Sequence, residues 1–191
     1  FLNRATQSTE IVSKLINFNA DDIKFDWRLN ERHYGALEGF NKSETAKKYG
    51  EDQVLIWRRS YDIPPPLLSH DDERNPKLNS KFANIDAKLP LGESLKDVVD
   101  RLKPFLEFYF SFISKNKGNH LIVAHSNSLR AIIKVLKNYS ENEIISVNIP
   151  TGVPLVYDLN SDLEVIKERY LINESELIKK QDLIKKQGMV K

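Results

Sequence analysis

His125 is the residue whose position in the sequence points most directly to chemistry. It follows the short apolar run 121–124, which predicts a strand covered on both faces, and precedes a helical stripe over 129–136. In open α/β sheets, ligands bind beyond the carboxyl ends of strands, where the next helix offers unpaired N–H groups. With Ser126 and Asn127 beside it, a charged His125 would suit phosphate and would stabilise a transferring phosphoryl group. The alternative is that His125 only caps the strand end through a hydrogen bond.

Residues 27–35 form a second candidate segment. They are too polar for a buried strand and have no helical stripe, so we predict an irregular segment of the kind that often carries function. Glu31 could serve there as an acid–base carboxylate, with Arg32, His33 and Tyr34 as its neighbours. For this block taken alone, a solvated charged turn is an equally good interpretation.

Four further cationic side chains could bind phosphate or a carboxylate. Arg4 and Lys42 lie near predicted helix starts, and Arg58 and Arg59 are adjacent. Arginine can hold such groups with two parallel hydrogen bonds. Because an isolated Lys or Arg is usually a surface charge, each of these candidates depends on the others lying nearby.

Metal and thiolate chemistry have little support. The chain contains no cysteine, which excludes disulfides, cysteine nucleophiles and cysteine-ligated zinc. His70 is followed by three acidic residues, 71–73, but consecutive residues do not share one face. We therefore predict no metal site.

The composition indicates one compact domain. The 191 residues are 40% hydrophobic, and 29 basic side chains nearly balance 27 acidic ones, giving a net charge of +2. Because basic and acidic side chains are so nearly equal in number, the net charge does not indicate nucleic-acid binding. No apolar run is long enough to span a bilayer. With no basic-then-apolar leader visible, we expect a cytoplasmic protein without a membrane partner.

Several elements can be predicted around these residues. Apolar spacing predicts a helix over 6–16 and a longer one from Ser94 that Pro104 should kink. Asn41 with Glu44, and Ser140 with Glu143, have the spacing of capping boxes. A hairpin is predicted from 155–159 and 163–166.

The chain is expected to comprise a domain over 1–172 and a mobile, Lys-rich tail over 173–191. The proline-rich stretch inside 40–92 predicts a lid-like excursion rather than core. The tail repeats the sequence LIKKQ and is predicted to be a frayed helix or a mobile arm.

Taken together, these stretches resemble the 2,3-bisphosphoglycerate-dependent phosphoglycerate mutases of the histidine phosphatase superfamily. The resemblance runs nearly end to end. It is carried by Leu2, Arg4, Ala5 and Thr9 near the start, and by LNERHYGAL at 29–37, NK at 41–42, WRR at 57–59, NSLRA at 127–131 and NIPTGVPLVY at 148–157. The blocks at 29–37 and 148–157 are long and specific, and they favour a mutase over a general phosphatase.

The resemblance implies a fold, a reaction and roles for residues. The fold would be three-layer α/β/α with a mostly parallel sheet, and the reaction would interconvert 3-phosphoglycerate and 2-phosphoglycerate through a phosphohistidine enzyme, in glycolysis and gluconeogenesis. The cofactor would be 2,3-bisphosphoglycerate without a metal, and a homodimer is compatible with the family. Glu31 would be the general acid/base, Arg4 and His125 would hold the transferring phosphoryl group, and the rest of the ligand would be bound by Arg32, Tyr34, Lys42, Arg58, Arg59, Ser126 and Asn127.

The sequence departs from the family in one important respect. The family's strand ending in Arg-His-Gly, which supplies the nucleophilic histidine and a central strand, has no counterpart in residues 1–191. We expect the chain to be poorly stable and inactive without that segment, with residual phospho-ligand binding at most; a histidine phosphatase is a third, weaker interpretation. Smaller departures are Ser126 where the family has Gly and Gly92 where a Thr is common.

Overall fold

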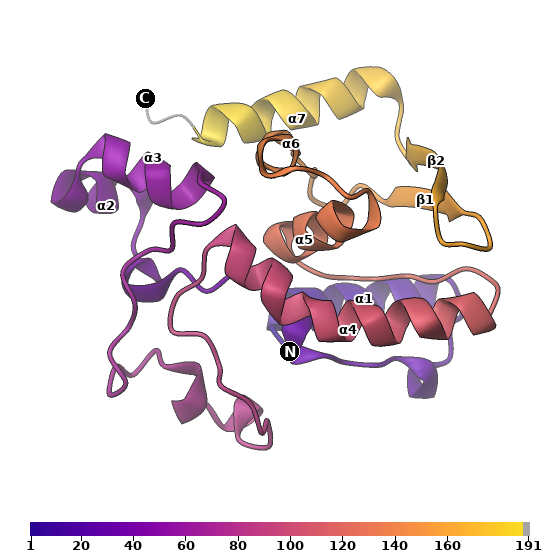
Figure 1. Cartoon of the computed structure of the whole chain (residues 1–191), viewed down its shortest axis with the longest axis horizontal. Coiled ribbons are helices and arrows are strands. Elements are labelled where there is room, and N and C mark those ends of the chain that lie inside the picture. Colours follow the sequence, from indigo (N-terminus) through magenta and orange to yellow (C-terminus); the bar gives the residue numbers. More distant parts are fainter. Residues whose placement is uncertain (189–191) are drawn as a thin grey trace.

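The computed structural model describes residues 1–188, without the side chains of residues 42, 43 and 185–188. Two helices, α4 (Leu95–Lys115) and α5 (Ser126–Leu136), lie side by side at its centre (Figure 1). Their facing sides supply most of the core, including Leu102 and Ala131, both at 0% exposure. The 3.6-residue apolar period that predicted the two helices is therefore the pattern that buries them.

The long helix α4 begins and continues for clear local reasons. Ser94 and Asp97 form a reciprocal capping box, so two of the amide groups that helix starts leave unpaired are satisfied. Pro104 lies inside the helix, which continues through it without a break. The predicted capping boxes at Asn41 and Ser140 are also present, and they begin α2 (Lys42–Tyr49) and α6 (Glu141–Ser146).

The remaining helices surround this centre. Helix α1 (Asn3–Leu15) is seen behind α4 in the view of Figure 1, while α2 and α3 (Glu51–Arg59) form a separate arm and α7 (Glu174–Gly188) lies beyond α6. The 173–191 tail is thus helical up to residue 188, and its last three residues lie outside the described part. No helix among the described residues has both the length and the apolar character needed to cross a bilayer.

The excursion after α3 is anchored to the 33–38 turn. It contains the short 3-10 helices η4 (Pro76–Leu78) and η5 (Ser80–Phe82), and it buries Leu68 and Leu89. Gly35 has φ +58°, and a Cβ there would lie 2.1 Å from the carbonyl oxygen of Pro66, so only glycine fits this contact. Parts of the excursion therefore pack as core, contrary to the prediction of a lid outside it.

The sheet is smaller than predicted. Strands β1 (Leu155–Leu159) and β2 (Val165–Tyr170) form the predicted antiparallel hairpin, with Leu155 opposite Tyr170, and they are the only strands within residues 1–188. The mostly parallel sheet is not formed there: residues 121–125 belong to no strand, although Ile122 packs against the core. The physical reason is that a strand needs a neighbour to satisfy its backbone N–H and C=O groups, and apolar composition alone does not provide one.

The core can be tested on α4 alone. We expect Leu102→Ala to lower the free energy of unfolding by about 2–5 kcal/mol, because it leaves a cavity at a fully buried position. Phe108→Ala on the same helix is the control, since Phe108 is 68% exposed. Urea denaturation followed by circular dichroism measures both, and equal losses would contradict the assignment of the core.

Candidate anion-binding site

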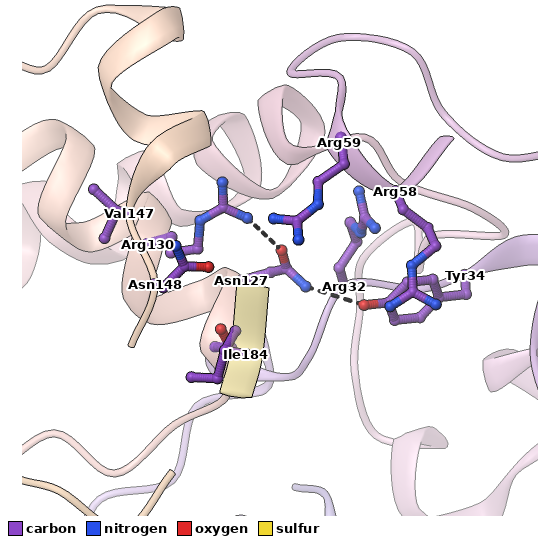
Figure 2. Close-up of a pocket in the computed structure, with 10 residues that line it drawn as sticks. Arg32, Tyr34, Arg58, Arg59, Asn127, Arg130, Val147, Asn148 and Ile184 are labelled. Atoms are coloured by element: carbon purple, nitrogen blue, oxygen red, sulfur yellow. Dashed lines mark hydrogen bonds between the residues drawn. The ribbon is translucent and has the colours of Figure 1, made fainter. Parts of the chain in front are cut away.

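A polar pocket of about 140 Å³ lies where α5, the end of α3 and the 30–34 segment meet (Figure 2). Among the described residues, its lining contains four arginines and no carboxylate. The residues that line it are Arg32, Tyr34, Arg58, Arg59, Ser126, Asn127, Arg130, Val147, Asn148 and Ile184. Such a concentration of cations in one cavity favours an anionic ligand with several oxygen atoms.

Arg32 is the most deeply buried of the four arginines, at 4% exposure. Its guanidinium carbon lies 4.7 Å from the Tyr34 ring centroid, and Nη1 donates weakly to the Trp57 carbonyl at 3.4 Å. Its Nε is buried and has no hydrogen-bond partner within the described structure. A buried cation with an unsatisfied donor is costly, and an oxyanion in the pocket would offset that cost.

Burial and mutual repulsion lower the pKa values of two of the other arginines, Arg58 and Arg130. The pKa of Arg58 is lowered, first by burial and then by Arg32 and Arg59, with Tyr34 acting in the opposite direction. The pKa of Arg130 falls to about 10, mainly through burial and secondarily through Arg32 and Arg59. The pocket therefore stores unfavourable electrostatic energy that an anion would relieve.

Glu31 lies where the 30–34 segment meets the start of α5. Its Oε1 accepts hydrogen bonds from the backbone N–H groups of Arg32, at 2.8 Å, and Asn127, at 3.3 Å. The second contact places the carboxylate at the amino end of the α5 dipole, which favours negative charge. A carboxylate held in this way has an oriented oxygen available for proton transfer.

His125 occupies the N-cap position of α5, and its side chain makes no capping hydrogen bond. The imidazole is 8% exposed, and its Nε2 is buried without a partner in the described residues. The pKa of His125 is lowered, first by burial; Glu31 raises it and Arg4 lowers it. Within the described residues, the His125 side chain thus makes no capping hydrogen bond at α5, and burial lowers the pKa of its imidazole.

A buried ion pair holds the segment that carries Glu31, Arg32 and Tyr34. Arg101 on α4 pairs with Glu93 at 2.7 Å, and their side chains are 7% and 4% exposed. Arg101 also donates to the carbonyl oxygens of Arg28, at 2.5 Å, and Asn30, at 3.3 Å.

Glu93 completes this clamp from the other side. Its carboxylate accepts from the His33 N–H at 2.9 Å, and its own N–H donates to the His33 carbonyl at 2.8 Å. Ser128 on α5 adds a hydrogen bond to the Asn30 carbonyl at 2.5 Å. An irregular segment with no ladder of its own is thereby fixed at both ends.

Comparison with known proteins identifies the family of this chain. The family model described as "Histidine phosphatase superfamily (branch 1)" matches residues 1–74 and 67–168. The chain belongs to the histidine phosphatase superfamily. Among its relatives, a protein of Treponema denticola named 2,3-bisphosphoglycerate-dependent phosphoglycerate mutase is 51% identical over 172 residues, covering 90% of this chain and 70% of that protein. A protein of the same name from Borreliella afzelii is 49% identical over 174 residues, covering 89% of this chain and 69% of its own length.

Solved structures agree on the fold of this superfamily member. A native structure of a mycobacterial glucosyl-3-phosphoglycerate phosphatase superposes with a TM-score of 0.58, covering 90% of this chain and 73% of that one, at 18% identity. A complex of that phosphatase with VO3 gives a TM-score of 0.60, covering 90% and 72%, at the same identity. These likenesses confirm the α/β class and the family fold.

The predicted site residues fall into two groups in this histidine phosphatase chain. The pocket wall brings together six of them, Arg32, Tyr34, Arg58, Arg59, Ser126 and Asn127. Arg4, Glu31 and His125 do not line that wall; they form a second cluster beside it, in which Glu31 and Arg4 act on the pKa of His125. Lys42 is the first residue of α2, and its side chain lies outside the described residues.

Four lining residues were not predicted as site residues: Arg130, Val147, Asn148 and Ile184. Arg130 and Asn148 lie inside two of the motifs that carried the family resemblance, but no role had been assigned to them. Arg130 could have been found from spacing, because a charged residue three positions after Asn127 shares its face of α5. Ile184 had no such signal, since it comes from a tail predicted to be mobile.

Metal binding has no geometric candidate here. Within the described residues, no group of three or more His, Cys, Asp or Glu side chains is placed to hold an ion.

The clamp yields a stability prediction. Arg101→Met should lower the free energy of unfolding by about 3–5 kcal/mol, because Glu93 would be left buried without its partner. It should also change Trp27 emission in a Trp57→Phe background, since the Arg101 guanidinium lies 5.8 Å from the Trp27 ring centroid. Lys103→Met is the control: its pair with Asp100 is surface-exposed and contributes about 0–1 kcal/mol. Similar losses in the two variants would contradict the clamp.

One partly buried histidine, His33, and one buried histidine, His125, predict acid sensitivity. The pKa values of His33 and His125 are both lowered from 6.5, in each case first by burial. Below about pH 6.5 the two histidines bind protons more readily in the unfolded chain than in the folded chain. Their contribution to the free energy of unfolding is therefore complete above about pH 6.5 and is lost on acidification. Protonation of His33 also removes the acceptor of the Gly35 N–H, which lies 3.0 Å from Nδ1.

We therefore expect the melting temperature of the ligand-free chain to fall as the pH drops from about 7.5 to about 5.5. His33→Asn and His125→Asn should each flatten that slope, whereas His120→Asn, at an exposed site, should not. Melting curves by differential scanning fluorimetry give the slopes. Unchanged slopes in the first two variants would show that His33 and His125 do not cause the loss of stability at low pH.

Proposed function

We propose that this chain carries the phosphoglycerate-binding and acid–base residues of a 2,3-bisphosphoglycerate-dependent phosphoglycerate mutase. The activity is the interconversion of 3-phosphoglycerate and 2-phosphoglycerate through a phosphohistidine enzyme. The observation that carries the proposal is the pocket with four arginines and no carboxylate, next to the Glu31 and His125 cluster. The names of relatives about half identical to this chain support the same activity.

The chain's own residues suit this reaction. Arg32, Arg58 and Arg59 would bind the phosphate and carboxylate oxygens, and the unpartnered Nε of Arg32 would gain an acceptor. His125, neutral in the free protein, would be charged next to a bound phosphoryl group and would donate to its oxygen. Glu31 would take the proton from the attacking substrate hydroxyl and return it in the reverse step.

The charge of the cavity lining supports the proposed cofactor. Cationic side chains on two walls match a ligand with phosphates at both ends, and they supply the charge neutralisation that Mg²⁺ supplies in other phosphoryl-transfer enzymes. When bound, 2,3-bisphosphoglycerate supplies the phosphoryl group that primes the nucleophilic histidine. Partners would be small phosphoglycerates and a second copy of the chain, and a glycolytic role would place it in the cytoplasm.

A second candidate function is phospho-ligand binding without transfer. Residues 1–191 contain no Arg-His-Gly motif. Of the four histidines, His33 accepts from the Gly35 N–H, and only His125 belongs to the cluster beside the pocket. A histidine phosphatase is the third candidate, and the sequence at 148–157 favours the mutase over it.

Calorimetric titration tests the ligand class. We expect 2,3-bisphosphoglycerate to bind more tightly than inorganic phosphate, with an affinity that falls at higher salt because the attraction is ionic. Arg59→Met should weaken binding about tenfold, the value of one charge-assisted hydrogen bond. Arg169→Met removes an arginine that pairs with Asp158 on the hairpin, and it is the control. Equal affinity for the two ligands would refute the proposed ligand.

Incubation with 2,3-bisphosphoglycerate separates transfer from binding. For the 191-residue chain alone, we expect bound ligand and no acid-labile phosphohistidine in intact-mass measurement. Mutase turnover above background would overturn the binding-only candidate. In a preparation that turns over, Glu31→Gln should abolish most transfer and leave binding within about threefold, because only its proton chemistry is removed. Unchanged turnover would remove Glu31 from the mechanism.

A further inference from the structure

Arg130 stands apart from the other arginines of the pocket. Arg32, Arg58 and Arg59 come from the 30–34 segment and the end of α3, whereas Arg130 projects from α5 on the opposite wall (Figure 2). It lies inside the motif NSLRA, and the proposed mechanism gives it no role.

Hydrogen bonds hold the Arg130 guanidinium on two sides. Nη2 donates to the carbonyl oxygens of Ile144, at 2.7 Å, and Ile145, at 3.3 Å, near the C-terminal end of α6. Those carbonyls belong to the last turn of α6, at the negative end of its dipole, and the Ile144 oxygen also accepts from the Val147 N–H at 3.3 Å. On the other side, Nη1 donates to Oδ1 of Asn127 at 3.2 Å. The guanidinium is thereby fixed between α6 and the pocket.

This contact decides which way the Asn127 carboxamide faces. A guanidinium has donors only, so the amide oxygen must face Arg130 and the amide nitrogen must face away from it. The nitrogen, Nδ2, donates to the Tyr34 hydroxyl at 3.2 Å, on the side of Arg32 and Arg58 (Figure 2). Turning the amide over would bring its N–H groups against those of Arg130. Asn127 is 8% exposed, so water cannot easily repair such a mismatch.

We propose that Arg130 is a positioning residue that fixes the Asn127 carboxamide with its N–H donors toward the pocket. This role deepens the proposed function and rests on it for the identity of the ligand. With the amide turned this way, the wall of α5 offers donors, as the arginines opposite do. The pocket thus selects oxyanions that accept hydrogen bonds from both walls, and it disfavours ligands that present a donor at Asn127.

The orientation itself is tested without ligand. In ¹⁵N-labelled protein, the Asn127 side-chain NH₂ signals are assigned by their loss in Asn127→Ala. We expect Arg130→Met to shift these signals and to speed their exchange with solvent, and Arg130→Lys, which keeps a donor and the charge, to preserve them in part. Arg169→Met should leave them unchanged. Unaltered Asn127 signals in Arg130→Met would overturn the proposal.

A double-mutant cycle tests the consequence for binding. Arg130→Met should weaken 2,3-bisphosphoglycerate binding about tenfold, but clearly less in an Asn127→Ala background, because the residue acts through Asn127. If the two losses multiply, Arg130 contributes only charge and the proposal fails. If the melting temperature falls while the affinity is unchanged, its role is structural and the proposal also fails. If the unaltered chain binds no bisphosphoglycerate, the proposed ligand is wrong, and the NH₂ signals still decide the role of Arg130.

Discussion

The buried pair of Arg101 and Glu93 is the interaction on which the site depends. The segment that carries Glu31, Arg32 and Tyr34 has neither helical nor strand hydrogen bonding over most of its length, so its shape must come from elsewhere. Arg101 supplies it with donors and Glu93 with an acceptor; Glu93 directly precedes the N-cap of α4, and Arg101 lies in the second turn of that helix. A buried ion pair is a weak source of net stability, but it is a strong constraint on geometry when every remaining lone pair is used. In this protein it fixes a loop to α4, the helix that contributes many of the core residues.

The pocket shows the opposite electrostatic arrangement. Its arginines are gathered without carboxylates among them, and burial together with their mutual repulsion lowers the pKa values of Arg58 and Arg130. Arg130 is held against this repulsion by hydrogen bonds to backbone carbonyls at the end of α6. This preorganisation means that an incoming anion meets donors already in place, so little binding energy is lost in ordering them.

Much of this arrangement follows from local sequence rules. The capping boxes at Asn41, Ser94 and Ser140, the apolar period of α4 and the hairpin over 155–170 are all decided by neighbours within a few residues, and they are present. The site residues of the 31–34 block were predicted by type. Their convergence with α5 was implied by the family resemblance and not by local rules, because it depends on Arg101, which is 73 residues from its partner Arg28. The mostly parallel sheet is not formed among the described residues for a related reason, because a strand forms only when a second segment pairs with its backbone.

The run 121–125 shows what such dependence on pairing means for the site. These residues end at His125, yet they lie in no ladder among the described residues, so the direction in which the imidazole approaches the cluster is set by whatever packs along 121–124. A substitution among those apolar residues would leave every chemical group of the pocket unchanged and still displace its histidine. In a genetic screen, a substitution in this apolar run would give the same loss of activity as a mutation of an active-site residue. Unpaired backbone groups of this kind also offer a place for another chain to pair. Pairing there would lower the solubility of the protein and displace His125 at the same time.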